Sequence, residues 1–244
     1  MNTTLPLSVP IPACTRGIQS QAGRPAVREE TPLKELIVHY RKIRPSIKRR
    51  IAEFRNIISH GKEDKIFSEL CFCILTANAN AAKCNEAVNE LSRLGLLDKG
   101  GVRRIRPKLK GRVRFHNKKA DYIVLARRPF RNELCLNIMG TPAAGNVADV
   151  RDRLVNRIKG YGYKEASHFL RNIGLGSDIA ILDRHILKNL KRYGVIDKIP
   201  VSVGARKVYL DIEEKMRLFS KEAGIPMDEL DLLFWSMQTG YIFK

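Results

Sequence analysis

The chain has 244 residues, and 45 Lys and Arg stand against 25 Asp and Glu, so the formal net charge is +20. About 44% of the residues are hydrophobic, which supports a packed core and excludes a wholly disordered chain. No apolar run approaches the roughly 18–20 residues of a membrane-spanning helix. So basic a chain attracts polyanions, and counterion release favours DNA or RNA over a membrane surface as the partner.

Residues 1–30 differ from the rest of the chain. They contain four prolines and show no hydrophobic periodicity. Such a segment buries too little apolar surface to offset the entropy lost on ordering, so we expect a disordered leader over 1–30. A signal peptide is not expected, because no Lys or Arg precedes Arg16 and prolines break the apolar stretch.

From residue 32 onward the pattern is helical. Apolar residues recur with a helical period through 33–58, with an interruption expected before Pro45. The segment 66–75 is apolar over a wide face, which is typical of a central helix, and a helix over 87–94 stops at Gly95. Helices are then expected over 117–128, 147–158, 164–172, 183–193, 205–223 and 227–238. Strand signals are nearly absent, so the predicted fold class is all-α.

The central segment carries Cys71 and Cys73, where a cysteine is usually a small hydrophobic residue. The other cysteines are Cys14, Cys84 and Cys135, and no pair has C-x-x-C spacing. We therefore expect reduced thiols. The five histidines lack ligand spacing with one another or with cysteine, so no metal site is expected.

The positive charge is concentrated between Lys99 and Arg131. These 33 residues hold 13 Lys and Arg and one acid, Asp121, so the stretch carries +12 of the +20. A run of charged residues is usually a solvated face. Here, however, nearly all the charges are positive, and they repel one another unless a bound anion reduces the repulsion.

The segment from Ile158 to Ala166, IKGYGYKEA, is the most informative. One expected helix ends before it and the next begins within it, and two glycines allow a tight turn between them. Ile158 and Tyr161 can pin the turn, while the second helix begins with backbone N–H groups suited to a phosphate. In a chain of +20, we expect a helix-hairpin-helix that binds a DNA backbone through Gly160, Tyr161 and Gly162, rather than an ordinary helical hairpin with a glycine turn.

The wider chain resembles a known family. The resemblance rests on GYGYKEASHFLRN (160–172), ILDRHI (181–186), CILTAN (73–78), VRFHN (113–117) and WSMQTGYIFK (235–244). The first two segments are similar to those of the helix-hairpin-helix DNA glycosylase superfamily. The others narrow the resemblance to the 8-oxoguanine DNA glycosylase/AP lyase type 2 family. It covers about 31–244 and implies one two-lobed helical catalytic unit, with the hairpin at about 147–172 and DNA in the cleft between the lobes.

A lone lysine is usually a solvated charge, but Lys164 stands where the second hairpin helix begins, beside the expected DNA backbone. A neutral amine there can attack the sugar C1′ and form a Schiff base, which arginine cannot do because it stays protonated. Asp183 is expected to cap the next helix, and its carboxylate can also stabilise positive charge at C1′ and assist proton transfer. The resemblance implies that this pair is catalytic, with base flipping, attack by Lys164, loss of the base and β-elimination.

Four further positions are candidates for base binding. Trp235 is either a core residue or a stacking platform for a flipped purine. The resemblance implies that a terminal carboxylate at Lys244 contacts the damaged guanine: 8-oxoguanine carries a hydrogen on N7, where guanine has a lone pair that the carboxylate would repel. Asn78 and Asn80 either fill the hole left by the flipped base, as the resemblance implies, or cap a helix end.

We therefore expect a DNA glycosylase with AP-lyase activity on double-stranded DNA containing 8-oxoguanine. It is expected to act as a monomer, without cofactor or membrane, at the nucleoid of a prokaryotic and specifically archaeal cytoplasm. A [4Fe–4S] cluster is not expected, because no cysteine follows Cys135. One alternative is an enzyme of the same fold for another damaged or mismatched base. The other is a non-catalytic helix-hairpin-helix module that holds DNA or RNA.

Overall fold

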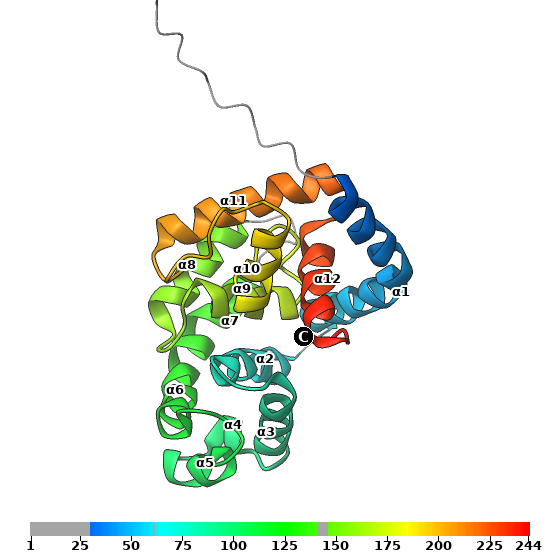
Figure 1. The fold of residues 1–244 in the computed structure, drawn as a ribbon. Helices are drawn as coiled ribbons and strands as arrows, with labels where there is room; N and C mark the ends of the chain where they lie inside the picture. Colours follow the sequence, from blue (N-terminus) through cyan, green and yellow to red (C-terminus); the bar gives the residue numbers. More distant parts are fainter. Residues whose placement is uncertain (1–29, 61, 141–145) are drawn as a thin grey trace, which may run out of the picture.

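The computed structural model describes residues 30–60, 62–140 and 146–244, so the expected leader lies outside the described residues up to position 29. Within these ranges the chain forms helices and turns without a β-strand, and the all-α prediction is confirmed (Figure 1). The helices are α1 (Glu30–His60), α2 (Glu63–Thr76), α3 (Ala81–Arg93), α4 (Leu96–Lys99), α5 (Val102–Leu109), α6 (His116–Pro129), the π-helical turn η1 (Phe130–Leu134), α7 (Cys135–Met139), α8 (Val147–Arg157), α9 (Tyr163–Asn172), α10 (Arg184–Arg192), α11 (Arg206–Ala223) and α12 (Met227–Thr239).

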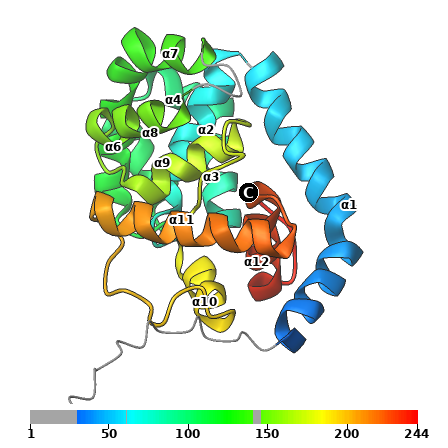
Figure 2. The same cartoon turned by 90° about the horizontal axis from the view of Figure 1, so that it is seen from above.

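The helices build two lobes, each around its own apolar core. The first core comes from α2 to α9 and includes the fully buried rings of Phe72 and Phe169. The second core joins α1 to α10, α11 and α12 and includes the fully buried rings of Tyr209 and Phe234. The first helix thus packs beside the last one, and the chain ends near the junction of the lobes (Figure 1 and Figure 2). The predicted two-lobed arrangement is confirmed.

The interruption predicted before Pro45 is wrong, because α1 runs through this residue without a break. A proline inside a helix removes one backbone hydrogen bond. The apolar side of α1 is buried against the second lobe on both sides of the proline, at Leu36, Tyr40, Ile47 and Ile51. Burial of such side chains contributes roughly 1.5–3 kcal/mol each, which offsets the loss.

The basic stretch 99–131 divides into surface charges and internal ones. Arg103 and Arg104 are exposed on α5, as expected of residues that meet an anion. Lys119, however, is buried, and Arg127 donates to three carbonyl oxygens at the end of α4. These two cations therefore stabilise the fold and are not part of a DNA-facing surface.

None of the helices in the described ranges combines the length and the apolar character needed to cross a membrane. Cys71, Cys73, Cys84 and Cys135 are free and buried, and burial raises the pKa of each thiol. They therefore behave as the small hydrophobic residues that the sequence predicts.

Candidate active site

A cavity of about 840 Å³ lies where the two lobes meet. Its walls come from the α2–α3 turn, the start of α9, the connection into α10, and α12 with the chain end. Seven of the nine predicted site residues line it: Asn78, Asn80, Gly162, Lys164, Asp183, Trp235 and Lys244. Residues far apart in the sequence thus meet at one concave surface.

The hairpin turn stands beside this cavity and is fixed from inside the first lobe. Gly160 has φ +87°, and a Cβ there would lie 2.5 Å from the ring of Tyr122, so only glycine fits. Tyr161 is buried, and its hydroxyl donates to the Leu70 carbonyl at 2.8 Å. The Tyr161 side chain therefore holds the turn in place, as the sequence predicts, and leaves the backbone of the turn at the surface.

Lys164 lies in the first turn of α9, and its side chain is 21% exposed. Its Nζ lies 3.6 Å from Oε1 of Glu165, while Oε2 of Glu165 accepts the Gly162 N–H at 3.2 Å. The N–H of Gly162 therefore already has a partner within the protein, although the sequence predicts that N–H groups at this helix start are available to a phosphate. Sequence reasoning overlooked Glu165, although an acid at the third position of a helix is a familiar partner for the backbone N–H before it.

Asp183 is the N-cap of α10, as predicted. Its Oδ1 accepts the N–H groups of His185 at 2.7 Å and Ile186 at 2.9 Å. Both bonds use the same oxygen, so Oδ2 takes no part in the cap. The capping interpretation and a role in the cavity are therefore compatible for this one carboxylate.

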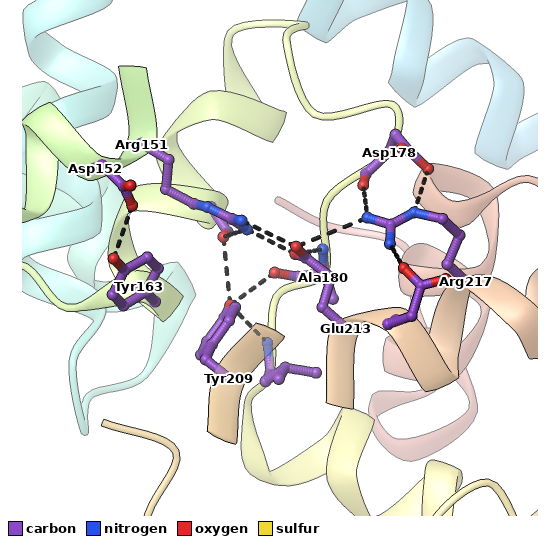
Figure 3. Close-up of polar contacts among 11 residues, drawn as sticks. Arg151, Asp152, Tyr163, Asp178, Ala180, Tyr209, Glu213 and Arg217 are labelled. Atoms are coloured by element: carbon purple, nitrogen blue, oxygen red, sulfur yellow. Dashed lines mark hydrogen bonds and ion pairs between the residues drawn. The ribbon is translucent and has the colours of Figure 1, made fainter. Parts of the chain in front are cut away.

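The connection that leads into Asp183 is buried and has no regular secondary structure, so its backbone groups need internal partners. Figure 3 shows how α11 supplies them. The Tyr209 hydroxyl donates to the Ala180 carbonyl at 2.7 Å and accepts the Leu182 N–H at 3.3 Å. Oε2 of Glu213 accepts the Ala180 N–H at 2.8 Å. The position of Asp183 is therefore set by α11 as well as by its own helix.

Three buried polar residues that sequence reasoning did not select also line the cavity. Arg171 and Asp231 approach to 3.5 Å between Nη2 and Oδ2, and both side chains are nearly inaccessible to solvent. Burial raises the pKa of Asp231 to about 7 even though Arg171 opposes the shift. Burial also holds the pKa of His168 well below its usual value, so this imidazole is neutral. Of these three residues only Asp231 could have been noticed in the sequence, because it is a charged residue within an apolar run.

Two of the four residues predicted to bind the base, Trp235 and Lys244, lie at the α12 end of the cavity. Trp235 is half-buried, and its ring meets Tyr241 edge-on at 5.2 Å between centroids. Lys244 places Nζ 2.8 Å from Oε1 of Glu69 and 4.5 Å from the ring centroid of Phe72. Trp235 is thus not a fully buried core residue, and the Lys244 side chain is tied to the first lobe.

The α2–α3 turn forms another part of the cavity wall. Asn80 caps α3, since its Oδ1 accepts the Lys83 N–H at 3.1 Å. Asn78 is exposed and has φ +54°, a left-handed conformation that asparagine adopts more readily than most residues. The capping alternative therefore holds for Asn80, and the exposed side chain of Asn78 is the better candidate to meet DNA.

Comparison with known proteins agrees with the resemblance. The family model described as 8-oxoguanine DNA glycosylase matches residues 47–225. A relative from Fusobacterium nucleatum, named 8-oxoguanine DNA glycosylase/AP lyase, is 42% identical over 208 residues, which cover 84% of this chain and 94% of the relative. A Methanocaldococcus jannaschii relative of the same name is 43% identical over 207 residues, covering 83% and 93%.

Solved structures agree as well. The 8-oxoguanine DNA glycosylase of Thermotoga maritima superposes with a TM-score of 0.78 at 34% identity, covering 88% of this chain and 99% of that one. The Methanocaldococcus jannaschii 8-oxoguanine glycosylase/lyase, in complex with a 15mer DNA containing 8-oxoguanine, gives a TM-score of 0.75 at 38% identity, covering 86% and 100%. The chain therefore belongs to the helix-hairpin-helix 8-oxoguanine DNA glycosylase family.

Proposed function

We propose that the protein is a bifunctional repair enzyme that removes 8-oxoguanine from double-stranded DNA and then cleaves the strand. Its curated relatives are named for both activities and span nearly the same length. The observation that carries the chemistry is that Lys164 and Asp183, which come from different elements, line one cavity at the junction of the lobes. A mere DNA clamp would not need an amine and a carboxylate in a concave site.

In this proposal the hairpin binds the DNA backbone. The backbone from Gly160 to Gly162 is exposed or half-buried at the glycines, and α9 begins directly after it. The first N–H groups of a helix are suited to a phosphate. In this proposal the phosphate next to the lesion lies against the hairpin, and Tyr161 keeps the turn rigid from within.

The flipped nucleotide then places its sugar between Lys164 and Asp183. Lys164 first gives up a proton, and its Nζ then attacks C1′; the C1′–N9 bond breaks, and the base leaves with the electron pair and takes up a proton. Opening of the sugar ring yields the Schiff base, loss of a C2′ proton follows, and β-elimination breaks the bond to the 3′ phosphate. Asp183 stabilises the positive charge that develops at C1′, with Oδ2 as the oxygen outside the helix cap.

The damaged base is held at the α12 end of the cavity. Trp235 offers its indole face for stacking on the purine. A carboxylate at Lys244, as the resemblance implies, would accept the N7–H that distinguishes 8-oxoguanine from guanine. The Lys244 ammonium on Glu69 would fix that group in position. Asn78 and Asn80 line the same cavity from the α2–α3 turn, and in this proposal they lie where the partner strand loses its paired base.

Borohydride trapping on a duplex with 8-oxoguanine opposite cytosine tests the proposal. The unmodified protein should become covalently linked to DNA and cut the strand. Lys164→Gln should abolish trapping and cutting while leaving DNA affinity largely intact. Lys159→Gln is the matched control, because Lys159 is an exposed hairpin cation outside the cavity lining. Cutting by Lys164→Gln at the normal rate would reject the Schiff-base mechanism, and preferential cutting of another lesion would reject the substrate.

A further inference from the structure

Lys119 is a lysine in an unusual environment. It lies on α6 with only 4% of its surface exposed. Its Nζ donates to the carbonyl oxygens of Leu75 and Ala77, both at 2.7 Å. These carbonyls belong to the C-terminal end of α2, where backbone oxygens have no partner within the helix. The ammonium therefore acts as a cap that the first lobe supplies from a different helix.

The turn that follows α2 depends on this cap. It continues through Asn78, whose φ of +54° is a strained conformation for a residue with a side chain. Such a conformation persists only where the surroundings fix it. The Leu75 carbonyl also receives the Cys84 thiol at 3.2 Å, so α2, α3 and α6 converge on one oxygen atom.

The same turn is part of the cavity. Residues from Thr76 to Ala81 line it, and the side chain of Asn78 is exposed there. Lys119 itself is absent from the lining. Burial lowers the pKa of Lys119, and among its neighbours Lys164 lowers it further while Glu165 opposes the shift. The ammonium is therefore internal, close to the catalytic candidates, and out of reach of a DNA phosphate.

We propose that Lys119 is a positioning residue for base removal, which holds the 77–80 turn so that Asn78 and Asn80 meet the duplex beside the flipped nucleotide. The inference rests on the role proposed above for that turn. A small displacement of groups that surround a reacting nucleotide can slow chemistry strongly, even when the altered residue does not touch the substrate.

Arg127 provides a matched control on the same helix. Its Nε donates to the Leu97 carbonyl, and its Nη2 donates to the carbonyls of Leu96 and Gly100, all at 2.7 Å. It therefore caps the end of α4 as Lys119 caps the end of α2. None of these four residues lines the cavity. Loss of the Arg127 side chain should therefore destabilise the fold about as much as loss of the Lys119 side chain, without moving the 77–80 turn.

The experiment compares Lys119→Met, Lys119→Arg, Arg127→Met, Asn78→Ala and the double variant Lys119→Met/Asn78→Ala. Single-turnover base release from an 8-oxoguanine:cytosine duplex is measured at temperatures equally far below each unfolding midpoint. We expect Lys119→Met to slow base release roughly 10- to 100-fold, Arg127→Met to have little effect, and Lys119→Arg to recover part of the rate. Lys119→Met should add little in the Asn78→Ala background, because both changes act through the same turn.

Equal rates for Lys119→Met and Arg127→Met, or an undiminished effect of Lys119→Met in the Asn78→Ala background, would overturn the inference. If Lys119→Met does not fold, Lys119→Gln replaces it, and amide exchange over 76–84 is followed together with the rate. Faster exchange there with slower base release supports the inference, while faster exchange at an unchanged rate overturns it. A normal rate for Asn78→Ala would instead contradict the proposed role of the turn, so the two failures are distinguishable.

Discussion

Arg151 on α8 and Glu213 on α11 form a bidentate ion pair that is buried on both sides (Figure 3). Nη1 lies 2.6 Å from Oε2, and Nη2 lies 2.9 Å from Oε1. Because Glu213 also accepts the Ala180 N–H, the pair ties two helices of the second half of the chain to the connection before Asp183. It is therefore part of the scaffold of the site as well as of the fold.

Glu213→Gln should destabilise the protein strongly. The change leaves the Arg151 guanidinium buried without its counter-charge, which costs about 3–5 kcal/mol and lowers the Tm by roughly 10 °C. Urea and thermal unfolding measure both effects. Glu214→Gln is the control, because Glu214 pairs with Arg217 at the surface and should cost at most about 1 kcal/mol. Equal losses for the two variants would contradict the importance of the buried pair.

Asp231 gives the folding stability a specific pH dependence. Burial raises its pKa from 3.8 to about 7, so between these values the folded state holds a proton that the unfolded state releases. The contribution of Asp231 to stability is therefore highest below about pH 4 and falls as the pH rises to 7, by at most about 1.4 kcal/mol per pH unit for one proton. Asp231→Asn keeps a neutral side chain of the same shape and removes this slope.

Urea unfolding of both proteins at pH 5, 6 and 7 measures that slope. The stability of the unmodified protein relative to Asp231→Asn should fall steadily across the series. A pH-independent difference would mean that Asp231 is already ionised in the folded state at pH 5. Asp228→Asn is a useful comparison, because burial raises the pKa of Asp228 in the same direction.

The long helices could be predicted from the sequence because their apolar faces repeat with the helical period. The predicted 147–158 and 164–172 helices differ from α8 and α9 by a single residue at one end. Pro45 could not be assigned in this way, because the local cost of a proline says nothing about the burial that offsets it. The short helices α4, α5 and α7 and the turn η1 were missed for a similar reason, since elements of eight residues or fewer carry little periodic signal.

The residues of the site fall into the same two groups, those that local sequence patterns identify and those that only tertiary contacts identify. Lys164 and Asp183 were identifiable because the hairpin motif and the helix start fix their local positions. The roles of Lys119 and Asp231 depend instead on what packs around them. One lysine among 13 basic residues gives no local sign that it will find two carbonyl oxygens on another helix. Residues of this kind emerge only when the tertiary contacts are known.

Asp183→Asn separates the capping role of this residue from its proposed chemical role. The amide oxygen of asparagine still accepts the N–H groups of His185 and Ile186, so stability should change little. Base release should slow roughly 100-fold or more, because the negative charge at C1′ is lost. Asp183→Ala should in addition lose about 1 kcal/mol of stability with the cap. Unchanged single-turnover rates for Asp183→Asn would count against the carboxylate as a catalytic group.

Trp235 and its neighbour Phe234 provide the final comparison. Phe234 is fully buried and stacks on Tyr193 at 5.5 Å, so Phe234→Ala should cost about 3–5 kcal/mol of stability. Trp235 is half-buried and lines the cavity, so Trp235→Ala should cost less stability. Stacking of a base on an aromatic side chain contributes about 1–3 kcal/mol. Trp235→Ala should therefore lower both the affinity for the lesion and the rate of base release, by roughly 5- to 150-fold.

Binding to an 8-oxoguanine duplex and to an undamaged duplex of the same sequence checks this prediction. Trp235→Ala should lose affinity for the lesion and keep affinity for undamaged DNA, because the hairpin grip is unaltered. Trp235→Phe should recover part of the loss, since a smaller ring still offers a stacking face. If Trp235→Ala loses stability to the same extent as Phe234→Ala and releases the base at the normal rate, Trp235 is a packing residue and the base must be held by other walls of the cavity.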